Sequence, residues 1–246
     1  MAGERATEST ESTRASESAA ADALVSNDAA SNHTRAPASQ AWRSQRAWIV
    51  LMLTAILGLA ADLGSKYVAF DWIAGTPVRL DREAVLEIGN ANYMIPPHDP
   101  VTVVPHVLEF KLLANHGAVF GIGQGKRWFF ILFTLLALVI SVGMFAGWTT
   151  ARDHLAHVAI GLVLAGGVGN LYDRYFYAFV RDFIHPLPGV TLPFGIAWPS
   201  GSREAWGYVS NVADLFLIIG IAVLMYRTLW PHKDSRMDAP APAPKA

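Results

Sequence analysis

Four apolar runs dominate the chain, and each is long enough to cross a membrane. A helix needs about 20 residues to span a hydrocarbon core of about 30 Å. The runs lie at 47–70, 128–148, 154–172 and 209–230. The second is the clearest, because it is uninterrupted and bounded by Trp128 and Trp148, a residue type enriched at membrane interfaces. One such run could be a buried core helix, but four in 246 residues predict a polytopic membrane protein.

Composition narrows the functions that such a chain can have. Hydrophobic residues make up 52% of it and charged residues only 16%, which fits a membrane class. The formal net charge of -1 provides no basic surface for nucleic acid, so we expect no such partner. The absence of cysteine excludes disulfides, thiolate metal sites and a cysteine nucleophile. Any hydrolytic chemistry must therefore use oxygen or nitrogen groups.

The two ends of the chain differ from the apolar middle. Residues 1–40 are rich in Ala, Ser, Thr and Glu and have few large apolar side chains, so they predict a disordered tail. This tail does not resemble a secretory signal peptide, because no apolar core follows a basic start. We expect one membrane domain over 41–232 and a second disordered tail over 233–246.

The basic residues predict how the spans are oriented. An even number of spans puts both termini on one side of the membrane. Basic residues flank both termini and occupy the short connection between the second and third spans: Arg43, Arg46, Arg152, Arg227, Lys233 and Arg236. The positive-inside rule places these segments in the cytoplasm, so the connections 71–127 and 184–208 face outward.

The outer connections carry a weaker secondary-structure pattern. Val, Leu and Phe partly alternate with other residues over 101–113, with Pro105 as an interruption, which predicts a small sheet. Pro and Gly are dense over 185–207, which predicts turns or a hairpin. The predicted fold class is therefore membrane all-α: four transmembrane helices with a small extracytoplasmic β-sheet between helices one and two.

Polar residues gather at the outer ends of the spans. Asp62 and Lys66 lie four residues apart on one helical face, and taken alone they favour a structural ion pair. In the third span a small and then polar face is formed by Gly166, Gly169, Asn170 and Asp173. Ser210, Asn211 and Asp214 open the fourth span as an ordinary helix cap with an acidic first turn.

Four carboxylates should therefore converge at one end of the bundle: Asp62, Asp173, Asp182 and Asp214. Two close carboxyl groups share a proton, so one can accept a proton from water while the other donates to a carbonyl. This chemistry requires neither metal nor other cofactor. A metal site is the rival, but the histidines are not spaced like a zinc site, and an outer magnesium site would usually serve phosphate substrates.

Five short blocks occur in order along the chain. They are DLGSK at 62–66, NHGAVFG at 115–121, GGVGNLYDR at 166–174, VRDF at 180–183 and NVAD at 211–214. With four spans between them, these blocks resemble the bacterial lipoprotein signal peptidases, also called signal peptidase II. The resemblance covers residues 46–230.

The resemblance implies an inner-membrane aspartic endopeptidase without a cofactor. Such an enzyme removes the signal peptide of a diacylglyceryl-modified prolipoprotein by cleaving before the lipidated cysteine, near the outer leaflet. Its partners would be that substrate and membrane lipids, and we expect a monomer. By motif position the catalytic pair is Asp182 and Asp214. Residues that bind substrate or support the site would be Asp62, Lys66, Asn115, Gly117, Asn170, Asp173, Arg174 and Asn211.

The chain departs from the family pattern at Ala165, Gly167, Val119 and Ser210, which affects packing and pocket shape rather than the pair. Two other functions stay open. A transporter or channel would line an ion path with intramembrane Asp and Lys residues. An inactive relative would bind lipidated peptides without cutting them. Physical reasoning predicts the cluster of four carboxylates, and only the resemblance selects two of them.

Overall fold

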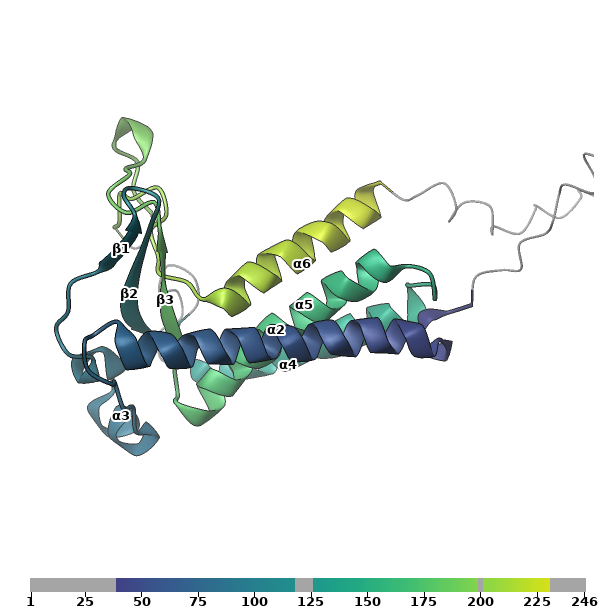
Figure 1. Ribbon diagram of the computed structural model, residues 1–246, viewed down its shortest axis with the longest axis horizontal. Coiled ribbons are helices and arrows are strands. Elements are labelled where there is room, and N and C mark those ends of the chain that lie inside the picture. Colours follow the sequence, from purple (N-terminus) through teal and green to yellow (C-terminus); the bar gives the residue numbers. More distant parts are fainter. Residues whose placement is uncertain (1–38, 118–125, 199–200, 231–246) are drawn as a thin grey trace, which may run out of the picture. The chain divides into compact units, whose positions relative to one another are not determined.

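A computed structural model describes residues 39–117, 126–198 and 201–230 (Figure 1). The tail predicted over 233–246 lies outside these residues, and so does the tail predicted over 1–40 except for Ser39 and Gln40. The second motif block, at 115–121, is described only as far as residue 117. The carbonyl of Ser39 accepts a hydrogen bond from Ala151 N at 2.8 Å, so the chain before the first span contacts the connection between the second and third.

The four predicted spans are confirmed as helices that are long and apolar enough to cross a membrane. They are α2 (Gln45–Trp72), α4 (Arg127–Gly147), α5 (His154–Phe176) and α6 (Val212–Leu229). The last one begins three residues later than 209, because Asn211 has an extended backbone and its side chain accepts from Asp214 N at 3.0 Å. A short helix η1 (Ala41–Arg43) precedes the first span.

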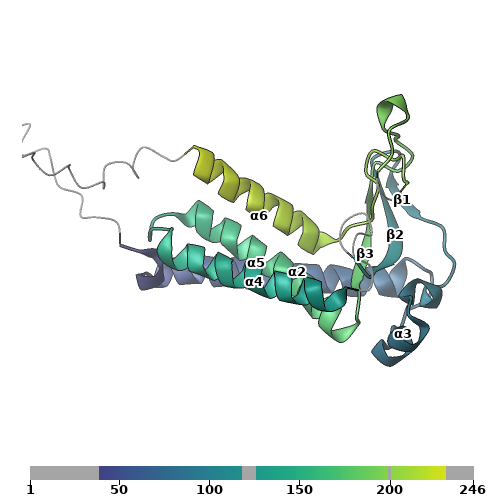
Figure 2. The same ribbon diagram turned by 180° about the vertical axis from the view of Figure 1, so that it is seen from behind.

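Helix α5 lies at the centre of the bundle, where it packs against α2, α4 and α6 (Figures 1 and 2). The glycines on one face of α5 make this packing possible. A Cβ atom on Gly166 would collide with the carbonyl oxygen of Ala213, and one on Gly169 would collide with the carboxylate of Asp62. The glycines therefore bring α2 and α6 close to α5 at the level of the polar residues.

The small sheet is also confirmed, with one addition. Strands β1 (Val101–Val104) and β2 (Leu108–Asn115) lie in the segment predicted to form a sheet and pair as a hairpin, and β3 (Val180–Pro186) pairs antiparallel with β2 to give the order β1-β2-β3. The third strand comes from the connection between α5 and α6, where the sequence predicted turns or a hairpin over 185–207 and no strand before them. The sequence does not reveal this strand, because Arg181 and Asp182 are both buried and its polar and apolar residues do not alternate.

The rest of the region that carries the sheet consists of short elements. Helix α3 (Arg82–Ile88) and the turn η2 (Ala91–Met94) precede β1, and η4 (Pro193–Gly195) lies between β3 and α6. An isolated bridge between Thr191 and Glu204 gives that last connection the hairpin character that its composition suggested. A buried cluster that includes Phe70, Leu112 and Phe183 joins the sheet to the end of α2. Strand β3 is thereby held directly beside the polar ends of the helices.

Candidate active site

Asp182 lies in the middle of β3, where it pairs with Leu113 of β2 and is 1% exposed. Both of its carboxylate oxygens accept hydrogen bonds from amides. Asn211 Nδ2 donates to Oδ1 at 2.6 Å, and Asn115 Nδ2 donates to Oδ2 at 2.9 Å. The strand and these two amides fix the position of the carboxylate.

Asp214 lies in the first turn of α6 and belongs to its capping box. The Asn211 side chain accepts from Asp214 N, and Asp214 Oδ2 accepts from Asn211 N at 3.3 Å. The other oxygen, Oδ1, accepts from Asn170 Nδ2 at 2.8 Å. The sequence suggested a helix cap or a catalytic residue at this position, and the side chain both completes the cap and borders the cavity described below.

Two asparagines connect the two carboxylates. Asn211 donates to Asp182 and, at 3.2 Å, to Asn170 Oδ1, while Asn170 donates to Asp214. Asparagine suits this position because one side chain carries both a donor group and an acceptor group. The result is one hydrogen-bond network that joins β3, α5 and the start of α6.

A buried cluster of four charged residues contacts this hydrogen-bond network. Lys66 Nζ lies 2.8 Å from Asp62 Oδ2 and 3.2 Å from Asp173 Oδ2, and it donates to Asn170 Oδ1 at 3.1 Å. Arg181 binds Asp173 through its guanidinium at 2.7 Å and through its backbone N at 3.0 Å. The ion pair expected between Asp62 and Lys66 is present, and it is part of the support for Asn170.

This cluster separates the four predicted carboxylates into two kinds. Asp62 and Asp173 are each in contact with a cation, and with Lys66 and Arg181 they form a neutral group of two acids and two bases. Within the described part of the chain, neither Asp182 nor Asp214 forms an ion pair. Burial without a partner cation favours a shared proton between those two groups.

The remaining predicted residues surround Asp182 and Asp214. Gly117 N donates to Asn115 Oδ1 at 2.9 Å, which orients the Asn115 amide so that its nitrogen faces Asp182. Arg174 Nη2 donates to the Gly117 carbonyl at 3.1 Å, and its guanidinium lies 5.2 Å from the centre of the Phe130 ring. The structure thus brings all ten predicted site residues into one connected region.

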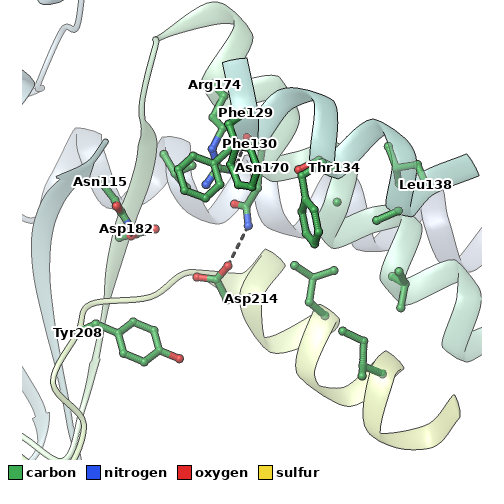
Figure 3. A pocket seen from close by; sticks show the side chains of 17 residues that line it. Asn115, Phe129, Phe130, Thr134, Leu138, Asn170, Arg174, Asp182, Tyr208 and Asp214 are labelled. Carbon is green, nitrogen blue, oxygen red and sulfur yellow. Dashed lines mark hydrogen bonds between the residues drawn. The ribbon is translucent and has the colours of Figure 1, made fainter. Parts of the chain in front are cut away.

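Both aspartates border a cavity of about 630 Å³ between the helices (Figure 3). One end is polar and is lined by the two aspartates together with Asn115, Asn170, Arg174 and Tyr208. The walls are apolar side chains of α4, α5 and α6, among them Phe129, Phe133, Leu138, Val163, Leu217 and Ile221. The cavity can therefore hold an apolar segment alongside a polar group at its end.

The surroundings of Asp182 change its acidity. Burial raises its pKa well above the ordinary aspartate value of 3.8, and the nearby charge of Asp214 raises it further. Hydrogen bonds from Asn115 and Asn211 act in the opposite direction but are weaker. Asp182 therefore keeps a proton at a pH where an exposed aspartate has lost it, as an acid catalyst requires.

Two residues of this region were not predicted from the sequence. Arg181 neutralises Asp173, and only the family block VRDF contained it. Tyr208 lines the cavity, and the hydroxyl is at the end of its ring that is nearer to Asp214 (Figure 3). Burial raises its pKa to about 12, with the two carboxylates as further causes. A tyrosine three residues before a helix cap has no sequence pattern that marks it, so only its place in space identifies it.

The chemistry available here is that of acids, bases and amides. Among the residues that the structure describes, no group of three or more His, Asp or Glu side chains is arranged to hold a metal ion. Two buried carboxyl groups beside an apolar cavity, one of them with a raised pKa, suit hydrolysis of a carbonyl compound by activated water.

Comparison with known proteins agrees with this chemistry. The family model for signal peptidase II matches residues 54–230. A lipoprotein signal peptidase of Hydrogenovibrio crunogenus is 32% identical over 176 residues, which cover 68% of this chain and 89% of that protein. Another, from Anoxybacillus flavithermus, is 31% identical over 138 residues, which cover 56% of this chain and 73% of that one.

Solved structures match the fold as well. Two structures described as bacterial membrane enzymes are each 26% identical to this chain with a TM-score of 0.52. One match covers 78% of this chain and 93% of the other, and the second covers 74% and 94%. The family model includes all four spans except the first residues of α2, together with both aspartates. The chain therefore belongs to the signal peptidase II family of membrane peptidases.

Proposed function

We propose that this signal peptidase cleaves diacylglyceryl-modified prolipoproteins before the lipidated cysteine, with Asp182 and Asp214 as its catalytic pair. Removal of signal peptides from prolipoproteins is the activity of the family. The observation that carries the assignment of the pair is the contrast among the four carboxylates. Among the described residues, Asp62 and Asp173 contact cations, whereas Asp182 and Asp214 accept hydrogen bonds from amides and border the cavity.

In the proposed mechanism the pair holds one proton. The ionised carboxylate takes a proton from water, and the water oxygen attacks the carbonyl carbon of the scissile bond. The protonated carboxyl group gives its proton to the carbonyl oxygen, which yields a tetrahedral intermediate. When that intermediate collapses, a proton passes to the departing amide nitrogen and the peptide bond breaks. Asn115, Asn170 and Asn211 keep the two carboxylates in position throughout.

The shape of the cavity fits the proposed substrate. Its apolar walls come from α4, α5 and α6, so an apolar signal peptide or an acyl chain could enter from the hydrocarbon region. The polar end brings the peptide bond to the two carboxylates. We place both termini in the cytoplasm and the site near the outer leaflet of the bacterial inner membrane, as the basic flanks suggest. A single chain supplies every polar group of the site, which suits a monomer.

A transporter or channel is not favoured, because the polar residues do not continue through the bundle. The charged cluster lies at one end, and the ion pair between Asp153 and Arg227 lies at the other. Between them a buried apolar cluster is formed by side chains that include Leu51, Ile160, Val163 and Leu224. An ion would have to cross this layer without a polar partner.

Purified protein in lipid vesicles tests the proposal directly. It should cut a diacylglyceryl-modified precursor and leave the same precursor without the diacylglyceryl group intact, and mass spectrometry should find the lipidated cysteine as the new N-terminus. Because the raised pKa of Asp182 preserves the shared proton as pH rises, kcat/KM should fall only well above pH 3.8. An inactive binder would show no product at all, and an alkaline limb near pH 3.8 would contradict the shared proton.

Replacing Tyr208 by phenylalanine should lower kcat by about 10²-fold and change KM little. A neutral hydroxyl beside the pair can donate a hydrogen bond to the oxygen that becomes negative in the intermediate, and a single such donor is worth about that much. Phenylalanine keeps the ring contact with Trp206, whose ring centre lies 5.1 Å away. Steady-state kinetics of the variant would contradict this role if kcat were unchanged or if only KM rose.

A further inference from the structure

The connection between β3 and α6 forms a two-stranded arm, which we define as residues 190–198 and 201–205. Backbone hydrogen bonds tie its two sides together: Leu192 N donates to the Arg203 carbonyl at 2.7 Å, and Ala205 N donates to the Val190 carbonyl at 2.6 Å. This backbone pairing gives the arm a defined shape, unlike an open loop.

The base of the arm is fixed to the sheet. His185 of β3 lies between two carboxylates, 2.7 Å from Glu109 Oε1 and 3.1 Å from Glu204 Oε2. Glu204 also accepts from Gly189 N at 3.2 Å through its side chain and from Trp198 Nε1 at 2.8 Å through its carbonyl. The arm is therefore held by contacts on both of its sides, and its tip is carried at a set position.

The tip of the arm presents large apolar side chains. Phe194 is 98% exposed and Ile196 is 55% exposed. The backbone of Phe194 has a φ of 61°, which is rare for an aromatic residue, and it stands between Pro193 and Gly195. At this exposure the ring has almost no contact with the rest of the arm. The sequence from 190 to 198 contains no charged residue.

The direction of the arm shows what its tip can meet. In Figures 1 and 2 the strands run across the direction of the helices, and η4 lies beyond the end of the sheet on the side of α6, opposite to α3. The arm thus extends sideways instead of continuing the line of the helices out of the membrane. Helix α6, on the same side of the molecule, carries exposed apolar residues, including Leu215 and Ile218, which face lipid in a membrane-spanning helix.

We propose that the arm is a membrane anchor whose tip inserts Phe194 and Ile196 into the lipid surface beside α6. Apolar and aromatic side chains bind at the boundary between headgroups and hydrocarbon. A second copy of the chain suits the tip less well, because a stable protein interface needs about 800 Å² from each partner and a three-residue turn provides far less. The anchor would hold the outer sheet, and with it Asp182, at a constant depth.

Spin labelling tests this proposal without reference to peptidase activity. The chain contains no cysteine, so Phe194→Cys creates a single attachment point for a nitroxide label. In vesicles, collision with oxygen reports lipid and collision with a nickel chelate reports water. Asp99→Cys, at an exposed position before β1, calibrates water, and Ile218→Cys on α6 calibrates lipid. The label at position 194 should prefer oxygen and lie closer to the α6 reference than to the water reference.

Two outcomes would overturn the proposal. A label at position 194 that matches the Asp99→Cys reference would place the tip in water. Broadening of its spectrum that disappears when labelled protein is diluted with unlabelled protein would instead indicate a second copy at the tip. The circular dichroism and thermal unfolding of the Phe194→Cys protein should match those of the wild type, because an exposed side chain contributes little to folding.

Discussion

Asn substitution at Asp182 or at Asp214 should each lower kcat/KM for the lipidated precursor by at least about 10³-fold. Asparagine has nearly the same shape as aspartate but can neither give nor take the catalytic proton. The two effects should not add in the double variant, because each single change already removes the shared proton. Cleavage in vesicles, followed by gel shift or mass spectrometry, measures the loss.

The control for this experiment is Asp71→Asn. Asp71 also belongs to α2, near its C-terminal end, but its only ion pair among the described residues is with Arg79 at 3.7 Å, and both side chains are partly exposed. This variant should keep close to full activity. The Asp182 and Asp214 variants should still bind the uncut precursor and unfold at a temperature near that of the wild type, so that lost activity reflects chemistry rather than folding.

Asp173 provides the sharpest test of the assignment. It contacts Lys66 and Arg181, and we assign it a supporting role. Asp173→Asn should therefore lower the unfolding temperature together with the activity. If it abolished cleavage at an unchanged unfolding temperature while Asp182→Asn stayed active, the reaction class would stand and the choice of the pair would be wrong.

The sequence was sufficient for the parts of the fold that depend on hydropathy. Four apolar runs predicted four spans, and alternation over 101–113 predicted β1 and β2. It did not predict β3, because a strand whose charged residues are buried has no alternating pattern. That strand carries Asp182, so the element most important to the site was the hardest one to find.

In the site too, contacts within one helix could be predicted from the sequence, whereas contacts between distant segments could not. Spacing along one helix predicted the contact between Asp62 and Lys66, since residues four apart lie on one face. Contacts between distant segments, such as Asp62 Oδ1 with Ala213 N at 2.9 Å, have no sequence signal. The ion pairs of Asp62 and Asp173 give a physical reason to distinguish Asp182 and Asp214 from them. The sequence supports that choice only through the family resemblance.

Lys66→Met should destabilise the protein by about 3–5 kcal/mol, the usual cost of leaving a buried charge without its partner. Lys66, Asp62 and Asp173 have no exposed surface, and methionine replaces the length of the lysine chain without its charge. Activity should fall as well, because Lys66 holds Asn170, and Asn170 holds Asp214. Thermal or denaturant unfolding in detergent, followed by tryptophan fluorescence, measures the change.

Two further variants separate the missing charge from lost packing. Arg79→Met removes a cation that is 75% exposed, and it should cost less than about 1 kcal/mol. The double variant Asp62→Asn with Lys66→Met removes the unpaired carboxylate while the asparagine oxygen can still accept from Ala213 N, so it should be more stable than Lys66→Met alone. If the double variant were less stable than Lys66→Met, the ammonium group would matter for its hydrogen bonds rather than for its charge. The neutral cluster would then not be what holds Asn170 in place beside the proposed catalytic pair.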